Sequence, residues 1–335
     1  MKTLPLKKLN ILSTLIVITL LFLLLRDLDF GKLVEALRDA DWGYYAIAVV
    51  VILILNSLGR IMRFRALLDA LPHPSNGMRF WDLVLISMGT RTLNIVLPAR
   101  AGEVYRAIHL SRHGYQIESA TTALLVEPLL EALGLGSTAF ALSVLNFAPL
   151  PFADIFNKLK WAFLIIVAAG IIFSALKLRA NPNTGQVSEN LLHSQSNSQS
   201  SFFDKIQNFF SRMGNTLHRL NSPRVWLKSL SWTWFADAAD CFSIGLCLWA
   251  VHIQLDWVSW FVIFAGVNIA IALPTVPGNV GTLEVGAILV LNMLGVDKSK
   301  ALAFTLLYHS VNTIPIALAG LIALKINSQR APTSP

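Results

Sequence analysis

Residues 97–106 read Leu-Pro-Ala-Arg-Ala-Gly-Glu-Val-Tyr-Arg, and residues 273–284 read Leu-Pro-Thr-Val-Pro-Gly-Asn-Val-Gly-Thr-Leu-Glu. These two stretches, the first break and the second break, interrupt hydrophobic segments with Pro and Gly and carry charge. When their Leu-Pro pairs are aligned, the next Gly and Val also align, as Leu-Pro-x-x-x-Gly-x-Val. Interrupted hydrophobic segments at corresponding positions of two halves indicate a substrate site near the bilayer midplane. The two breaks therefore predict a repeated membrane architecture with a site between its halves.

Composition predicts an all-α polytopic membrane protein. Hydrophobic residues make up 55% of the chain and charged residues 14%, whereas a soluble domain is about 25% charged. No stretch has the length, polarity and periodicity of a soluble catalytic domain. Six apolar runs are candidates for full spans, because about 20 apolar residues cross a bilayer; they are 9–25, 44–58, 120–147, 161–176, 225–251 and 301–324.

The segments 80–112 and 257–296 surround the breaks and are predicted to be re-entrant hairpins. With a cytoplasmic N-terminus, six spans and two such hairpins, most of the 27 Lys and Arg residues fall on the cytoplasmic side. This is the positive-inside bias, so the net charge of +8 reports orientation and no nucleic-acid partner is expected. The halves would then form an inverted repeat with both termini cytoplasmic. The alternative is about eight simple spans, with both breaks in surface loops.

The chain is expected to form one transmembrane domain over 1–335. Its first half covers 1–178 and its second half 225–325, with a polar cytoplasmic linker at 179–201 rich in Ser, Asn and Gln. Residues 202–220 have the apolar stripe of an amphipathic helix, which would lie in the headgroup plane or pack against the bundle. The first apolar run ends without a small-residue cleavage site, which favours an uncleaved anchor.

Charged and polar residues inside the predicted membrane region supply the candidate site, because a charge in hydrocarbon usually faces a cavity or a partner. Several share a helix face, such as Glu127 with Glu131. The candidate substrate-binding residues are Arg100, Gly102, Glu103, Arg106, Glu127, Glu131, Pro277, Gly278, Gly281 and Glu284. Secondary candidates are Arg91, Asp237, Asp240, His309 and Asn312.

Each candidate also has a structural interpretation. The arginines could cap a hairpin or reach headgroups, the carboxylates could form structural ion pairs, and His309 could be a hydrogen-bonded core residue. Pro277, Gly278 and Gly281 suit a broken helix and a tight turn. Buried arginines, free amides at helix starts and carboxylates together favour a lipid phosphate over a sugar or a metal ion.

Signals for catalysis are weak. A Gly-rich phosphate loop, a Cys/His metal spacing and a nucleophile-elbow motif are all missing from the sequence. We therefore expect no enzyme activity, no metal and no cofactor, while the two acidic pairs leave a membrane transferase as an open alternative.

The first break resembles the P-x-R-x-G-E-x-x-R signature of the flippase-like transmembrane family. The second break resembles that family's P-x-x-P-G-x-x-G-x-x-E signature, and the segment from Asn56 to Arg60, with Arg63, resembles its second span. This adds Arg60 to the secondary candidates. The family includes the membrane domain of bacterial lysylphosphatidylglycerol synthase, also called the multiple peptide resistance factor, which is linked to moving aminoacylated phospholipid between leaflets. The resemblance covers essentially the whole chain.

In those synthases a separate C-terminal domain transfers lysine, whereas this chain stops at Pro335, soon after its last span. The resemblance therefore implies a stand-alone flippase-like protein of the bacterial inner membrane. Its expected cargo is an anionic or modified (glyco)phospholipid or a polyprenyl-type lipid. The alternative is a non-transporting membrane partner of a lipid-modifying enzyme or a glycosyltransferase.

Overall fold

The structure, a computed structural model, describes residues 30–71, 78–97, 100–145, 222–272 and 277–330, with isolated positions between 147 and 165 and at 220. The expected first span, the linker and most of the amphipathic helix lie outside these residues, as does most of the run 161–176. Helices and turns account for the described part, which contains no strand. The expected all-α fold is confirmed.

Long helices form the frame of the molecule. One continuous rod consists of α3 (Trp42–Val50), the π-helical segment η1 (Val51–Asn56) and α4 (Ser57–Leu68). Residues Trp42–Leu68, Ile117–Val144 and Lys298–Gln329 are long and apolar enough to cross a membrane. The second and third of these segments correspond to α7 (Ile117–Val144) and α14 (Lys298–Arg330). A further long helix, α11 (Pro223–Ala250), contains four charged residues and is less apolar. The protein is therefore a multi-pass membrane protein.

Two pairs of short helices surround the breaks. The first hairpin consists of α5 (Phe80–Val96) and α6 (Ala101–Arg112). The second consists of α12 (Trp257–Ile271) and α13 (Thr282–Met293), with the 3₁₀ turn η3 (Pro277–Asn279) between them. These helices have 12 to 17 residues and so are about 18 to 26 Å long. Each is shorter than the roughly 30 Å hydrocarbon core of a bilayer.

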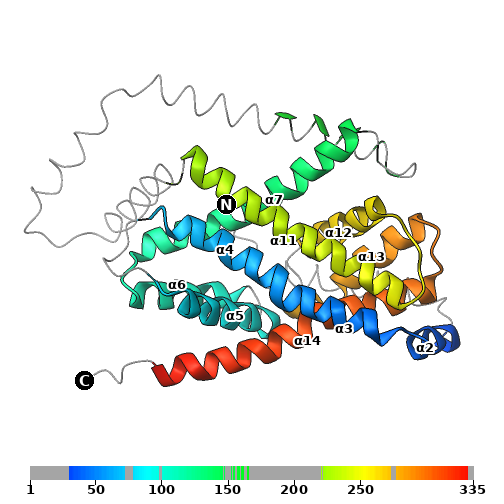
Figure 1. Cartoon of the computed structure of the whole chain (residues 1–335), viewed down its shortest axis with the longest axis horizontal. Helices are drawn as coiled ribbons and strands as arrows, with labels where there is room; N and C mark the ends of the chain where they lie inside the picture. Colours follow the sequence, from blue (N-terminus) through cyan, green and yellow to red (C-terminus); the bar gives the residue numbers. More distant parts are fainter. Residues whose placement is uncertain are drawn as a thin grey trace, which may run out of the picture.

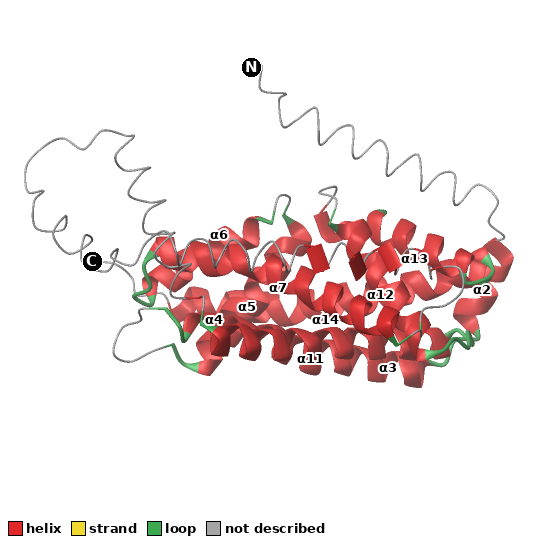
Figure 2. Ribbon diagram, turned by 90° about the horizontal axis from the view of Figure 1, so that it is seen from above, coloured by secondary structure: helices red, strands yellow, loops and turns green. Residues whose placement is uncertain are grey.

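The two hairpins enter the bundle from opposite ends. Helix α11 runs antiparallel to the rod, because the Asp41 N–H donates to the Ala250 carbonyl (2.8 Å) at one end and Lys228 pairs with Asp69 (3.4 Å) at the other. The first hairpin follows α4 at the Asp69 end, and the second follows α11 at the Ala250 end. Figure 1 places α5 and α6 toward one end of the bundle and α12 and α13 toward the other, and Figure 2 agrees. A short helix, α2 (Phe30–Arg38), lies at the Ala250 end.

The order of a long helix, a hairpin and a long helix thus occurs twice, in opposite directions. The rod, the first hairpin and α7 make one copy, and α11, the second hairpin and α14 make the other. Each hairpin turns back where Pro interrupts the chain: Leu97, just before Pro98, is extended as expected for a residue preceding proline. This is the arrangement of an inverted repeat.

Helix α14 runs the length of the bundle and contacts both hairpins. Its first half holds the second break through His309, as described below. Its second half crosses α5 closely: the Thr92 hydroxyl donates to the Ile316 carbonyl (3.0 Å), and a Cβ on Gly320 would overlap Thr92 and Met88. Small residues permit this approach of two helices, as is common inside membranes.

Candidate functional site

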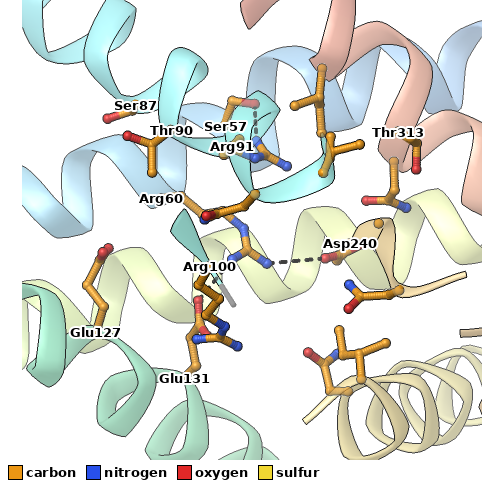
Figure 3. A pocket seen from close by; sticks show the side chains of 18 of the residues that line it. Ser57, Arg60, Ser87, Thr90, Arg91, Arg100, Glu127, Glu131, Asp240 and Thr313 are labelled. Carbon is orange, nitrogen blue, oxygen red and sulfur yellow. Dashed lines mark hydrogen bonds and ion pairs between the residues drawn. The ribbon is translucent and has the colours of Figure 1, made fainter. Parts of the chain in front are cut away.

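The tips of the two hairpins meet inside the bundle and enclose a cavity of about 630 Å³. A Cβ on Gly278 in the second break would lie 3.4 Å from the Ile95 carbonyl near the first break. Leu97 and Arg100 line the cavity from the first hairpin, and Gly278 and Asn279 line it from the second. Side chains of α4, α5, α7, α11, α12 and α14 complete its wall (Figure 3).

A buried ion-pair network forms the α7 side of the cavity. Glu127 accepts from the Arg106 Nη1 (2.5 Å) and from the Arg63 Nη2 (3.2 Å). Glu131 accepts from the Arg63 Nη2 and the Arg60 Nη1, both at 2.9 Å. Arg63, Arg106 and Glu127 are buried, and the Arg106 guanidinium lies 3.4 Å from the centre of the Phe64 ring. Each buried charge therefore has a counter-charge, as burial requires.

The π-helical segment η1 positions the opposite wall. Ser57, directly after this segment, lines the cavity, and Asn56 at its end contacts the lining residue Asp240; such π-helical turns are frequent at functional sites. The Asn56 amide donates to Asp240 (3.3 Å), which also accepts from the Tyr308 hydroxyl (2.7 Å). The Arg60 Nη2 lies 3.8 Å from the same carboxylate, a contact marked in Figure 3.

Two arginines of the cavity stand apart from this network. The Arg91 guanidinium donates to the Ser57 hydroxyl (2.7 Å), and Arg100 is exposed at the start of α6 with a left-handed backbone (φ 53°). Among the described residues, neither has a carboxylate within ion-pairing distance. The other three cavity arginines are paired with its four carboxylates. With five arginines and four carboxylates the lining carries one surplus positive charge, and Arg91 and Arg100 are the guanidinium groups that an anion could bind without breaking an ion pair (Figure 3).

The second break is held by Glu284 and His309. Gly278 and Gly281 adopt φ of 71° and 86°, which favours glycine, and the Gly281 N–H donates to Glu284 (2.6 Å). The other Glu284 oxygen lies 2.5 Å from the His309 Nδ1, while the His309 Nε2 lies 3.1 Å from the Gly278 carbonyl. Glu284 thus fixes the break to α14 and is absent from the cavity lining.

Glu103 and Glu284 are each the third residue of the helix that follows a break. Glu103 accepts from the Asn94 amide (3.1 Å), and the Asn94 oxygen accepts from the Gly102 N–H (2.8 Å). A Cβ on Gly102 would overlap the Thr90 carbonyl, so this glycine permits α6 to pack closely against α5. The sequence alignment pairs Gly102 with Gly278, but Gly102 lies within a helix whereas Gly278 lies in a turn. The residues at corresponding structural positions are instead Glu103 and Glu284.

The structure places most of the sequence-predicted residues around the cavity, and some outside it. Lining residues among them are Arg60, Arg91, Arg100, Glu103, Arg106, Glu127, Glu131, Asp240, Gly278, His309 and Asn312. Gly102, Gly281, Glu284 and Asp237 do not line it, and the side chain of Pro277 lies outside the described residues.

Several lining residues escaped the sequence-based candidate list. Arg63 carries the centre of the ion-pair network, and its spacing of three from Arg60 was a usable signal. Asn94, Asn268, Thr313 and Tyr308 are isolated polar residues in apolar helices, which gives them little sequence signal.

Comparison with known proteins agrees with the family resemblance seen in the sequence, over most of the chain. The family described as the lysylphosphatidylglycerol synthase TM region matches residues 10–320. A UPF0104 membrane protein of Methanocaldococcus jannaschii is 25% identical over 239 residues, which cover 70% of this chain and 93% of that protein. The glycosyltransferase AglD of Haloferax volcanii is 26% identical over 337 residues, covering 91% of this chain. The chain spans about half (52%) of the length of that glycosyltransferase.

Proposed function

On the premise that the chain belongs to the lysylphosphatidylglycerol synthase TM-region family, whose model matches most of its length, we propose a function in transport. The protein would move an anionic lipid between the two leaflets of the membrane. The observation that supports this most is the cavity at the meeting point of two hairpins of opposite direction, in which Arg91 and Arg100 have no carboxylate partner in the part of the chain that the structure describes. A phosphate is the anion that every phospholipid or polyprenyl phosphate presents, and arginine is well suited to bind it.

The opposed hairpins supply a route to either side. In transporters built from inverted repeats, one half moves against the other around a fixed midplane site. The two breaks touch at Ile95 and Gly278 and border the same cavity, so relative motion of the hairpins would open it toward one end or the other. Glu127 and Glu131 balance the arginines of the wall in this proposal.

Charge at the two ends supports an orientation. The end at which the first hairpin enters carries basic residues such as Arg65, Arg79 and Arg224, whereas at the opposite end basic residues such as Lys32 are interspersed with acidic ones such as Asp39 and Asp256. By the positive-inside rule the first hairpin enters from the cytoplasm. We propose a bacterial inner-membrane location with cytoplasmic termini.

A second candidate is a non-transporting membrane partner of a glycosyltransferase or another lipid-modifying enzyme. The relative named a glycosyltransferase favours it, because about half of that protein lies beyond the match. In this case the cavity charges would be structural, and loss of a free arginine would leave function intact.

Lipid movement in proteoliposomes tests the two candidates. Leaflet-resolved movement of labelled phosphatidylglycerol, an aminoacylated derivative and a polyprenyl phosphate would be compared for wild type, Arg91→Gln and Arg100→Gln. Arg112→Gln is the matched control, because this exposed arginine of α6 is absent from the cavity lining. Movement of an anionic lipid that is lost only in the cavity variants is expected. Folded protein that moves none of these lipids would contradict transport and favour the partner role.

A further inference from the structure

We propose that the cavity binds a lipid phosphate whose headgroup is a neutral polyol, such as a sugar, and discriminates against a cationic aminoacyl headgroup. The inference rests on the proposed function and narrows its substrate class. It follows from which polar groups of the cavity wall already have a hydrogen-bond or ion-pair partner within the protein and which do not.

The anion end of the ligand has a defined place. Arg91 comes from α5 and Arg100 from the first break, and both line the cavity without a carboxylate partner among the described residues. Guanidinium groups bind phosphate oxygens through charge-assisted hydrogen bonds, which are about twice as strong as neutral ones. The phosphate would therefore lie against the first hairpin.

The second half of the protein contributes neutral acceptors. The Asn268 amide nitrogen donates to the Phe264 carbonyl (2.8 Å), and the Asn312 amide nitrogen donates to the Tyr308 carbonyl (3.1 Å). These bonds to the preceding turn leave the amide oxygens without a donor among the described residues. The Thr313 hydroxyl lines the same side (Figure 3). Amide oxygens and a hydroxyl accept from hydroxyl groups, which a sugar presents in number.

A cationic headgroup would have to compete with arginines for a partner. An ammonium group would seek a carboxylate, and the cavity has four, yet every one lies within 4 Å of an arginine nitrogen. The cavity is lined by five arginines and four carboxylates, so its net charge is positive and repels an added cation. The free acceptors that the second half contributes, the Asn268 and Asn312 amide oxygens, are neutral, so the headgroup they suit is neutral.

The size of the cavity agrees with a headgroup larger than phosphate. Its volume of about 630 Å³ lies within the 300 to 1,000 Å³ range of small-molecule sites. Arg91 and Arg100 belong to the first half, whereas Asn268 and Asn312 belong to the second, so one ligand of this size would contact both halves.

Binding to the purified full chain in detergent tests the proposal separately from transport. The probes are a dodecyl hexosyl phosphate, dodecyl phosphate and a short-chain lysyl phosphatidylglycerol, with affinities measured by calorimetry. We expect the hexosyl phosphate to bind at least about tenfold more tightly than dodecyl phosphate at about pH 5, where both probes carry about one negative charge, since two neutral hydrogen bonds contribute about that much. The lysyl lipid should bind more weakly than either.

Variants assign the two ends of the ligand. Asn268→Leu and Asn312→Leu should remove the gain from the hexose while dodecyl phosphate still binds, which also demonstrates a folded protein. Asn292→Leu is the matched control, because this half-buried asparagine of α13 is absent from the cavity lining. Arg91→Gln should weaken both phosphate probes equally.

Two results would overturn the proposal: tighter binding of the lysyl lipid, or a hexose gain that survives both Asn substitutions. If the hexosyl phosphate binds as expected but no lipid moves between leaflets, the transport proposal fails while this inference stands. If a lipid is moved but the hexose adds no affinity, the inference alone fails.

Discussion

Replacing Glu127 by Gln removes a single charge from the centre of the ion-pair network while keeping the shape of the side chain. Glu127 is buried and faces two arginines, at 2.5 Å for Arg106 and 3.2 Å for Arg63. The consequences for these two partners differ. Arg63 keeps Glu131 at 2.9 Å, whereas Arg106 keeps only Glu103 at 3.7 Å. The cost therefore falls on Arg106, a buried guanidinium left with one distant counter-charge.

Removal of one partner of a buried ion pair costs about 3–5 kcal/mol. We expect the lower end, about 3 kcal/mol, because the Gln amide oxygen still accepts a hydrogen bond and Glu103 still contributes. With a shift of about 2–4 °C per kcal/mol in large domains, the melting temperature should fall by about 6 °C or somewhat more. Glu131→Gln is the matched control: its side chain is 38% exposed against 11% for Glu127, and Arg60 and Arg63 each keep another carboxylate. That control should cost about 1 kcal/mol.

Thermal unfolding of the detergent-solubilised protein measures both variants. The double variant Glu127→Gln with Arg106→Gln removes the stranded charge and should recover about 1–2 kcal/mol of the loss. A Glu127→Gln variant no less stable than Glu131→Gln, or a double variant in which the two losses simply add, would refute the pairing that the structure assigns.

Three further predictions test the fold and the breaks. Gly320→Ala places a methyl group against Thr92 and Met88 and should cost about 2 kcal/mol or more in thermal unfolding; Gly43→Ala, whose nearest atom is the movable Asp41 carboxylate at 3.0 Å, should change little. His309→Ala removes a partner of Glu284 and of the Gly278 carbonyl, a loss of about 2 kcal/mol. In a background without Cys241 and Cys247, this variant should speed thiol labelling of Asn279→Cys about 30-fold. An unchanged labelling rate would exclude His309 as the group that holds the second break. Arg79→Cys and Arg112→Cys should both react with an impermeant thiol reagent from the cytoplasmic side, and Asp297→Cys from the other side. Labelling of Arg79→Cys and Arg112→Cys from different sides would replace the first hairpin by a single full span.

Sequence alone predicted the fold well because its determinants are local. Runs of apolar residues define helices long enough for a bilayer, and Pro98 or Pro277 with Gly278 interrupts a helix wherever the chain lies. The sequence did not predict the π-helical turn at Val51–Asn56, which leaves no compositional signal and yet lies directly before the cavity-lining Ser57.

The candidate site was predictable as a set of residue types but not as a pattern of partners. Charges within the membrane region selected Arg91, Arg100 and Glu127 together, because the cost of burying them is the same for each. Which arginine is paired depends on contacts across 20 to 180 positions of sequence, as between Arg60 and Asp240. The distinction between a paired and a free guanidinium therefore appears only in three dimensions.

The long crossing of α5 and α14 has a consequence for biosynthesis. Thr92 and its partner Ile316 are separated by 224 residues, so at about 5–20 residues per second the first hairpin waits about 10 to 45 s for the helix on which it packs. The contacts of Glu127 with Arg106 and Arg63, only 21 and 64 residues away, lie wholly within the first half. A nascent chain can thus neutralise these charges among themselves as soon as α7 has been made. The early part of the protein is able to reside in the bilayer before the late part exists.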